Sequence, residues 1–561
     1  MRTPTGMRAI ALTLLSALVA IACTSADGAT SPTVEGSAAD PSSPSGNLMT
    51  PAESACAMPH EQLLRVWRGT RIGASGNVQI VPAEPNYLGA GFSHAGPWDY
   101  VQRVPMFFYG PGFIRELGRV ERAPTLVDIA PTQAALLGFD FAAPDGRVLA
   151  DVLVPAAERP SPPKLVVTLV WDAAGRNVLD TWPDSWPTLE RLIPRGAWFE
   201  RASIGSSPSN TPPTHAAIGT GAFPRRHGVI DLYQEVGGEI VKPQDDGPGV
   251  LRLPTLADLY DVAMDNEPVV GVVATLGAHT GMLGHGSLWE GGDRDIAVMR
   301  ELEDAETGGA EGVRWELTTG MAPYFRMPDY VNDVPGIEQD LDALDQADGM
   351  LDERWRDHPF SQLEGGFQSP ARTPYQMRIV EEVIEREGFG ADDVPDLLYL
   401  NFKAADSIGH RFSLNGIEMS DTLESLDASL GELIRFLDEQ VGQGEWALTL
   451  TADHGHQYDP QVSGAFQIGT RPLANYLETR LGGTDEAPVV IRVRPTQLWV
   501  DEAVLAANGF TLDDVATAVL AATQAETADE GVEVVDPEAR VFSMAVPTLT
   551  LEELPCLADG A

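Results

Sequence analysis

The stretch Lys164-Leu-Val-Val-Thr-Leu-Val-Trp171, followed directly by Asp172, decides the fold class of this chain. A continuous apolar run rich in β-branched residues is typical of a strand that is buried on both faces, as in the middle of a parallel sheet. Residues 377–386 and 418–441 carry apolar side chains at helical spacing. Strands of this kind alternating with helices predict an α/β fold with a mostly parallel central sheet.

Two further predicted strands end in the same way as the first. Residues 395–402 lead to Asp406, and residues 446–451 lead to Asp453 and His454. Open parallel sheets bind ligands at the carboxyl ends of their strands. We therefore expect the carboxylates that follow the three strands to converge at one edge of the sheet.

The composition of the chain limits its possible partners. Its 561 residues, of which 43% are hydrophobic, suffice for one large catalytic domain with an inserted cap, or for about two to three average domains. The formal net charge of -45 repels nucleic acid and anionic lipid surfaces, so no nucleic-acid binding is expected. A phosphate ester substrate must therefore be captured by a local positive centre, which bound metal ions supply.

The N-terminal segment has the pattern of a bacterial export signal. Residues 1–22 combine two arginines with an apolar stretch too short for a comfortable membrane span, and they end in a sequence similar to a lipobox before Cys23. We expect Cys23 to be lipidated and residues 23–50, rich in small and polar residues, to form a flexible tether. The protein is then exported and held by its lipid anchor alone, on the outer face of the cytoplasmic membrane or in the periplasm. Ordinary secretion with removal of Cys23 is the alternative.

Aspartate and histidine occur at metal-ligand spacing after two of the predicted strands. The spacing Asp406-x3-His410 allows one turn of helix or loop to direct a carboxylate oxygen and an imidazole nitrogen to one ion. Asp453 and His454 offer two adjacent ligands to a neighbouring ion. Zinc accepts such mixed oxygen and nitrogen ligands. The alternative, exposed Asp and His in surface loops, would have to recur independently at each strand end.

A candidate nucleophile lies between the predicted strand that ends at Trp171 and the one that spans residues 395–402. In the segment from Ser207 to Gly221, Thr211 precedes two prolines and a helix expected from His215 to Gly219. A metal ion lowers the pKa of an oxygen that it binds, so a metal-bound Thr211 could attack phosphorus. The N-terminal amides of the helix suit an anion. Taken by itself, Thr211 is better explained as an N-cap residue.

Together these segments resemble the alkaline phosphatase superfamily, and within it the type I phosphodiesterase/nucleotide pyrophosphatase group. The resemblance implies a three-layer sandwich with an inserted cap, and two divalent metal ions, zinc being the expected metal. It is carried by the motifs Asp172, Thr211-x3-His215, Thr220-Gly221, His227-Gly228, Asp406-x2-Gly409-His410 and Asp453-His454-Gly455.

The resemblance also assigns the metal ligands. One ion is assigned to the four residues Asp172, Thr211, Asp453 and His454. The other ion is assigned to Asp406 and His410, and it lacks its third ligand, a histidine that the family places downstream of the Asp-His-Gly motif. After His456 this chain contains no histidine.

The missing ligand has a match near the N-terminus. The segment from Ser93 to Gly112, which contains His94, resembles the terminal block of the family. We therefore assign His94 as the third ligand and expect the domain to be circularly permuted. His456 is the local alternative, disfavoured because it follows an existing ligand closely.

The permutation defines the domain boundaries and brings the chain ends together. Residues 51–160 form the displaced C-terminal block, and residues 161–561 form the rest of the catalytic domain, with a cap inserted at about residues 228–390. Cys56 and Cys556 lie close to the two ends, and export puts them in an oxidising compartment, so we expect them to form a disulfide. Two free buried thiols are the alternative.

The resemblance implies a phosphoric ester hydrolase that acts through a covalent phosphothreonine on Thr211, with the adjacent Asn210 binding the substrate. Monoesterase relatives carry a Lys-x-Arg pair in the cap, but the aligned stretch from Thr275 to His279 contains neither cation. This favours phosphodiesters or nucleotide pyrophosphates as substrates, with a phosphomonoesterase as the alternative. A sulfatase is disfavoured because Thr211 stands where a Cys or Ser is needed. A catalytically idle, metal-binding surface lipoprotein stays open.

Overall fold

The computed structural model describes residues 48–159, 161–243, 247–299 and 315–557. The expected signal peptide (1–22), the lipidation site Cys23 and the tether up to residue 47 lie outside the described residues. In the part of the chain that the structure describes, no helix is long and apolar enough to cross a membrane.

Within these ranges, the centre of the fold is an eight-stranded sheet with the order β10-β9-β13-β5-β14-β3-β6-β4. Strands β10, β9, β13, β5 and β14 run parallel, whereas β3 is antiparallel to both of its neighbours. The strands span β3 (Met106–Tyr109), β4 (Gly118–Val120), β5 (Leu165–Trp171), β6 (Ala197–Phe199), β9 (Val270–Val273), β10 (Ile296–Val298), β13 (Asp396–Phe402) and β14 (Trp446–Thr451). The predicted α/β fold with a mostly parallel central sheet is confirmed.

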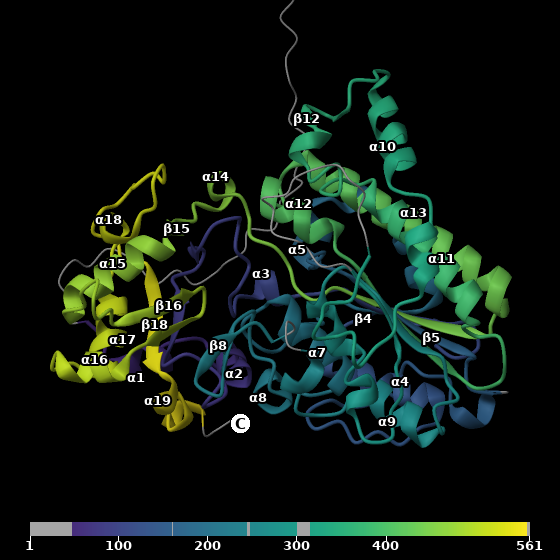
Figure 1. Ribbon diagram of the computed structural model, residues 1–561, viewed down its shortest axis with the longest axis horizontal. Helices are drawn as coiled ribbons and strands as arrows, with labels where there is room; N and C mark the ends of the chain where they lie inside the picture. Colours follow the sequence, from purple (N-terminus) through teal and green to yellow (C-terminus); the bar gives the residue numbers. More distant parts are fainter. Residues whose placement is uncertain (1–47, 160, 244–246, 300–314, 558–561) are drawn as a thin grey trace, which may run out of the picture. The chain divides into compact units, whose positions relative to one another are not determined.

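Helices cover both faces of this sheet, which makes three layers (Figure 1). Alternate side chains of β5, beginning with Leu165, pack in one core with helices α11 and α13. The intervening Val166 and Val170 pack in a second core with helices α4 and α9. Because successive side chains of a strand point to opposite faces, a strand between two helical layers is apolar throughout. The helices span α4 (Ile129–Leu137), α9 (Leu256–Ala263), α11 (Arg372–Glu387) and α13 (Ile417–Leu437).

A second sheet of the described residues has four antiparallel strands in the order β16-β17-β1-β18. Helices α15 and α17 pack in its core. These elements span β1 (Val78–Pro82), β16 (Val490–Arg494), β17 (Gln497–Val500), β18 (Phe542–Pro547), α15 (Thr470–Leu481) and α17 (Leu512–Ala521). Strand β1 lies in this sheet and β3 in the central one, so the expected N-terminal block, residues 51–160, contributes strands to both sheets.

The expected cap at residues 228–390 is not a separate insertion. This segment supplies strands β9 and β10 to one side of the central sheet and helices α9 and α11 to its two faces. The expectation of an irregular cap is wrong here because β9 is a run of only four residues, Val270-Gly-Val-Val273, which is too short to stand out as a buried strand.

The N-terminal block lies beside a strand that leads to the expected metal ligands. Strand β3 pairs antiparallel with β14, the strand that precedes Asp453. Cys56 and Cys556 form a disulfide with their Cα atoms 5.8 Å apart, which ties α1 (Pro51–Cys56) to the C-terminal end of the described chain. Both contacts are compatible with a permuted domain, and the permutation itself stays a prediction.

Removal of this disulfide should lower stability. The bond joins residues 500 positions apart, and loss of a native disulfide typically costs about 2 to 5 kcal/mol, because the unfolded chain gains freedom. We expect the Cys56→Ser, Cys556→Ser double variant to show a reduction in the free energy of unfolding of that size, measured by urea denaturation. Equal urea midpoints for the variant and the unreduced wild type would contradict this expectation.

Candidate metal centre and nucleophile

Three strand ends of the central sheet deliver carboxylates to one place. Asp172 follows β5, Asp453 follows β14, and Asp406 lies on α12 (Ala404–Phe412), directly after β13. All three side chains are buried. Their position at the carboxyl ends of parallel strands is where such sheets bind ligands.

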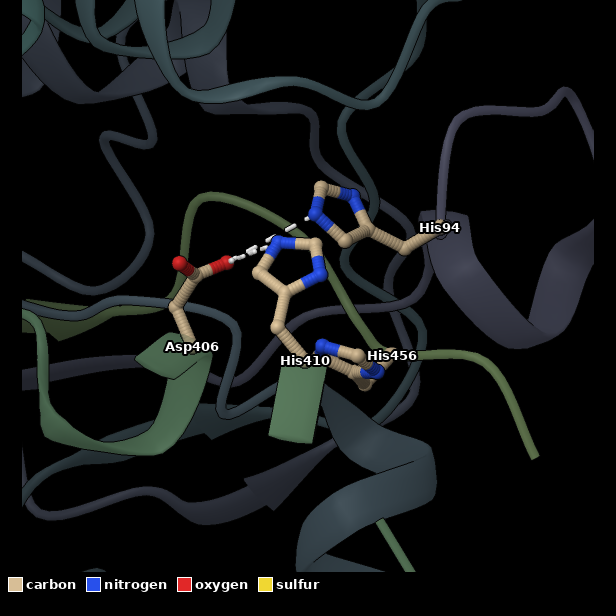
Figure 2. Close-up of side chains that lie close together, drawn as sticks. All are labelled: His94, Asp406, His410 and His456. Atoms are coloured by element: carbon tan, nitrogen blue, oxygen red, sulfur yellow. Dashed lines mark ion pairs between the residues drawn. The ribbon is translucent and has the colours of Figure 1, made fainter. Parts of the chain in front are cut away.

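The first cluster, called here the His94 group, consists of His94, Asp406, His410 and His456, whose ligand atoms lie within 4.8 Å of one another (Figure 2). Oδ1 of Asp406 is 3.5 Å from Nε2 of His94 and 3.4 Å from Nε2 of His410. His94 therefore lies within coordinating reach of both residues although it comes from the N-terminal block.

The backbone around His94 and His410 leaves a lone pair on each Nε2 atom. Nδ1 of His94 lies 2.8 Å from the carbonyl oxygen of Ser209, and Nδ1 of His410 contacts the carbonyl oxygen of Gly91. A carbonyl oxygen only accepts, so in the neutral ring each Nδ1 carries the proton. The two Nε2 atoms then face Oδ1 of Asp406, which has no hydrogen-bond partner among the residues that the structure describes. With both rings neutral, three lone pairs converge here, an arrangement that a bound cation would satisfy.

His456 belongs to the same group but presents its ring differently. The backbone N–H of Gln457 donates to its Nδ1 at 3.0 Å, so the neutral ring carries its proton on Nε2, for which the described part of the chain offers no hydrogen-bond partner. In this tautomer His456 cannot bind a metal ion through Nε2, unlike His94. Gly409 leaves room for the ring, since a Cβ there would lie 2.4 Å from Cδ2 of His456. Its closeness to His454 in the sequence does not keep His456 out of the His94 group. The tautomer of His456 is what distinguishes it from His94 as a metal ligand.

The second cluster, called here the His454 group, consists of Asp172, Asp453 and His454. Nε2 of His454 is 3.2 Å from Oδ2 of Asp453 and 3.9 Å from Oδ1 of Asp172. Nδ1 of His454 lies 2.9 Å from the carbonyl oxygen of Gly455, so its Nε2 also points a lone pair at the carboxylates in the neutral ring. Oδ1 of Asp453 accepts the backbone N–H of Ala173, whereas its Oδ2 has no hydrogen-bond partner within the described ranges.

Both groups fit a divalent metal ion. Each combines carboxylate oxygen with imidazole nitrogen, a donor set that zinc accepts, and each contains a buried carboxylate oxygen that no described residue hydrogen-bonds. The groups are neighbours, because the rings of His94 and His454 stack with their centroids 3.8 Å apart. This arrangement suits two neighbouring ions, as in two-metal hydrolases.

Thr211 opens helix α7 (Thr211–Thr220) beside the His454 group. Its Oγ1 lies 3.5 Å from Nε2 of His454, and the residue is 7% exposed. The helix begins earlier than the predicted His215, because proline in the first turn needs no N–H partner and already has a helical φ. The N-cap residue is Asn210, so the explanation of Thr211 as an N-cap is wrong.

The first turn of α7 offers fewer amides to an anion than expected. Pro212 and Pro213 carry no N–H, and the N–H of Thr214 donates to the carbonyl oxygen of Asn210. Of the N-terminal amides expected to face an anion, the N–H of Thr211 is the one that remains in this turn. Positive charge for a phosphate must therefore come from cations.

Asn210, the expected substrate-binding residue, is engaged in a buried network. Its Nδ2 donates to Oδ1 of Asp231 at 2.6 Å, and Nε2 of Gln497 donates to Oδ2 of the same carboxylate at 2.9 Å. Gln497 belongs to β17, so this network links the start of α7 to the second sheet. The substrate-binding role of Asn210 stays a prediction.

His215, part of the Thr211-x3-His215 motif, is not available as a ligand. Its Nδ1 donates to the carbonyl oxygen of Thr211 at 2.8 Å, and its Nε2 accepts from Nδ2 of Asn401 at 2.9 Å. Both ring nitrogens are therefore used within the protein. The ring is fully buried, and its hydrogen bond to the carbonyl oxygen holds the backbone of Thr211 in place.

His279 is a site residue that sequence reasoning misses. Its Nδ1 accepts the backbone N–H of Leu276 at 3.1 Å, which leaves the proton on Nε2, 3.2 Å from Oδ2 of Asp172. Such a contact orients a ligating carboxylate. Burial lowers the pKa of His279 to about 4, so the ring adds no positive charge at neutral pH.

Sequence reasoning also misses two cations, of which Lys403 contacts the ligand carboxylates and Arg372 contacts a neighbour of one of them. Nζ of Lys403 lies 3.0 Å from Oδ1 of Asp172 and 2.6 Å from Oδ2 of Asp406. The guanidinium of Arg372 donates at 3.2 Å to Oγ of Ser407, the residue that follows Asp406. Neither cation belongs to a metal-ligand spacing in the sequence, so the sequence does not predict that either lies near the site.

The buried charges set the protonation states of the centre. Burial works against a charged His454, but the carboxylates of Asp453 and Asp172 outweigh it and raise the pKa of this ring to about 9. Burial, together with the neighbouring His454, lowers the pKa of His94 to about 4. Burial opposes ionisation of Asp172, yet the ammonium of Lys403 holds the pKa of this carboxyl well below its usual range. A metal ion that binds to His454 must therefore displace a proton.

Comparison with known proteins shows which sequences this chain is similar to. A sequence profile described as type I phosphodiesterase / nucleotide pyrophosphatase matches residues 166–542. The chain is 24% identical over 398 residues to alkaline phosphatase PafA from Elizabethkingia meningoseptica, with 63% of this chain and 72% of that protein covered. It is 25% identical over 426 residues to a protein named calcium-transporting ATPase from Myroides odoratus, with 65% and 74% covered.

The fold is also shared with a solved structure. The crystal structure of wild-type alkaline phosphatase PafA matches with a TM-score of 0.51 and 21% sequence identity. The match covers 64% of this chain and 76% of that chain. The central sheet and its helical layers are thus those of an alkaline-phosphatase-like domain.

Proposed function

Because the chain belongs to the type I phosphodiesterase/nucleotide pyrophosphatase family and is a phosphoric ester hydrolase, we propose that it cleaves phosphodiesters or nucleotide pyrophosphates with Thr211 as the nucleophile. The position of Oγ1 of Thr211, 3.5 Å from Nε2 of His454, carries this proposal. The hydroxyl belongs to the first residue of a buried helix, so the backbone holds it more rigidly than a loop would.

Two divalent metal ions, most simply zinc, complete the proposed site. One is held by His94, Asp406 and His410, and the other by Asp172, Asp453, His454 and the hydroxyl of Thr211. When bound, the ions supply positive charge for phosphoryl oxygens and lower the pKa of an oxygen that they bind.

The covalent chemistry consists of two displacements. Oγ1 of Thr211 loses its proton and forms a bond to phosphorus, while the bond from phosphorus to the leaving oxygen breaks and the leaving oxygen takes up a proton. Water then cleaves the phosphothreonine, and Thr211 regains its hydroxyl proton. Two in-line displacements restore the original configuration at phosphorus.

The charge of the site supports a diester over a dianionic monoester. The stretch aligned with the cation pair of monoesterase relatives contributes His279, which is neutral because burial lowers its pKa to about 4. The ammonium of Lys403 is positive, but it is paired with two carboxylates. The additional negative charge of a monoester therefore has little unpaired positive charge to meet.

A phosphomonoesterase is the second candidate. The guanidinium of Arg372, bonded to Ser407 beside Asp406, supports it as a cation close to the site. The name alkaline phosphatase, carried by a relative that is 24% identical, also supports it.

Hydrolysis of two nitrophenyl esters separates the candidates. We expect the zinc-loaded protein to cleave bis-p-nitrophenyl phosphate with a kcat/KM at least about tenfold higher than that for p-nitrophenyl phosphate. Thr211→Ala protein, purified in parallel, corrects for contaminating phosphatases. A higher kcat/KM for the monoester would favour the second candidate over the first.

A further inference from the structure

Lys403 joins the two ligand groups through a single ammonium. Its Nζ lies 2.6 Å from Oδ2 of Asp406 in the His94 group and 3.0 Å from Oδ1 of Asp172 in the His454 group. The lysine is the N-cap residue of α12, and its side chain is 11% exposed. Both carboxylates are buried, so the ammonium stands where the two groups approach each other.

We propose that Lys403 is a positioning residue that ties these two carboxylates together, stabilises the metal-free site and weakens the hold of the His454 group on its metal ion. A buried charge that loses its partner destabilises a protein strongly, because its desolvation cost is no longer compensated. Lys403 supplies a compensating cation from within the chain, before any metal ion binds. The inference rests on the proposed two-metal function of this site.

At the His94 group, the lysine and a metal ion can share one carboxylate. On Asp406 the ammonium contacts Oδ2, whereas Oδ1 faces Nε2 of His94 and Nε2 of His410. The ammonium therefore fixes the carboxylate in the orientation that directs Oδ1 at the two imidazoles. Lys403 acts here as a support for the ligand.

At the His454 group, the lysine and a metal ion compete. The ammonium contacts Oδ1 of Asp172, the oxygen that lies 3.9 Å from Nε2 of His454. Oδ2 of Asp172 already accepts from Nδ2 of Asn401 at 2.9 Å and faces Nε2 of His279 at 3.2 Å. A metal ion in this group must therefore share Oδ1 with a positive charge that repels it. We expect this group to bind its ion more weakly than the His94 group does.

The substitution Lys403→Met tests the inference, because it removes the charge and keeps most of the side-chain volume. We expect the Tm of the metal-free protein to fall by roughly 5 °C or more, and that of the zinc-loaded protein to fall clearly less. Zinc retention is measured by elemental analysis after equilibration with graded EDTA. We expect the variant to keep its more weakly bound ion up to an EDTA concentration about tenfold higher than the wild type does.

Two further variants serve as controls. Lys164→Met is the matched control, because Lys164 stands at the start of β5 and pairs at 3.9 Å with the fully exposed Asp393. We expect it to change neither the metal-free Tm nor the zinc retention. Lys403→Arg keeps the positive charge and should recover most of the metal-free Tm that Lys403→Met loses.

Several outcomes would overturn the inference. An equal fall in Tm with and without zinc would show that Lys403 has an ordinary packing role. Unchanged zinc retention in Lys403→Met would show that Lys403 does not compete with the metal ion. If Lys403→Met folds only when zinc is present during expression, the inference is supported; if it folds in neither condition, the inference is refuted. A wild-type protein that binds no zinc would refute the proposed function, whereas an unchanged metal-free Tm of Lys403→Met would refute this inference alone.

Discussion

Replacing Thr211 by alanine is expected to lower kcat/KM for phosphate esters by at least about a thousandfold, as loss of the nucleophile does in other covalent hydrolases. The substitution removes the Oγ1 that lies 3.5 Å from Nε2 of His454. It leaves the carboxylates and imidazoles of both ligand groups in place, so the zinc content, measured by elemental analysis, should change little.

Thr220→Ala is the matched control for this variant. Thr220 lies at the other end of α7, is also buried, and its Oγ1 donates to the carbonyl oxygen of Ala216 within the helix. We expect Thr220→Ala to keep most of the activity. If Thr211→Ala remained as active as Thr220→Ala, Thr211 would not be the nucleophile.

Replacing His94 by alanine should remove one metal ion and most of the turnover. Nε2 of His94 faces Oδ1 of Asp406 at 3.5 Å and completes the set that includes His410. Without it, two strong ligands remain, whereas catalytic zinc sites use three protein ligands. We expect the zinc content to fall from about two ions per chain to about one, and kcat/KM to fall at least about a hundredfold.

The control for His94→Ala is His60→Ala. His60 is exposed at the start of α2 (His60–Gly69), in the same N-terminal block, and its loss should change neither zinc content nor activity. Zinc content that stays at about two ions in His94→Ala would contradict the assignment. The ligand role would then pass to His456, whose ring would have to move its proton from Nε2 to Nδ1.

The central strands and the residues at their ends could be predicted from the sequence. Strands β5, β13 and β14 begin within one residue of the predicted positions and end where predicted, because a strand buried on both faces is an unbroken apolar run. Asp172, Asp406 and Asp453 follow these runs, and the carboxyl ends of parallel strands share one edge of the sheet. The short strands β9 and β10 escaped prediction because three or four residues carry too little pattern.

The sequence by itself thus determined three central strands of the sheet, the carboxylates at their ends and the motif residues, since local apolar patterns and ligand spacings are present along the chain. Only the tertiary structure decided which groups complete the centre. Lys403 and His279 reach Asp172 from other strand ends and loops, and no spacing records such contacts. The backbone partners of His94 and His456 decide which ring can bind a metal ion. Protonation and charge pairing depend on atoms that folding brings together from distant parts of the chain, and this is why they cannot be derived from the order of residues.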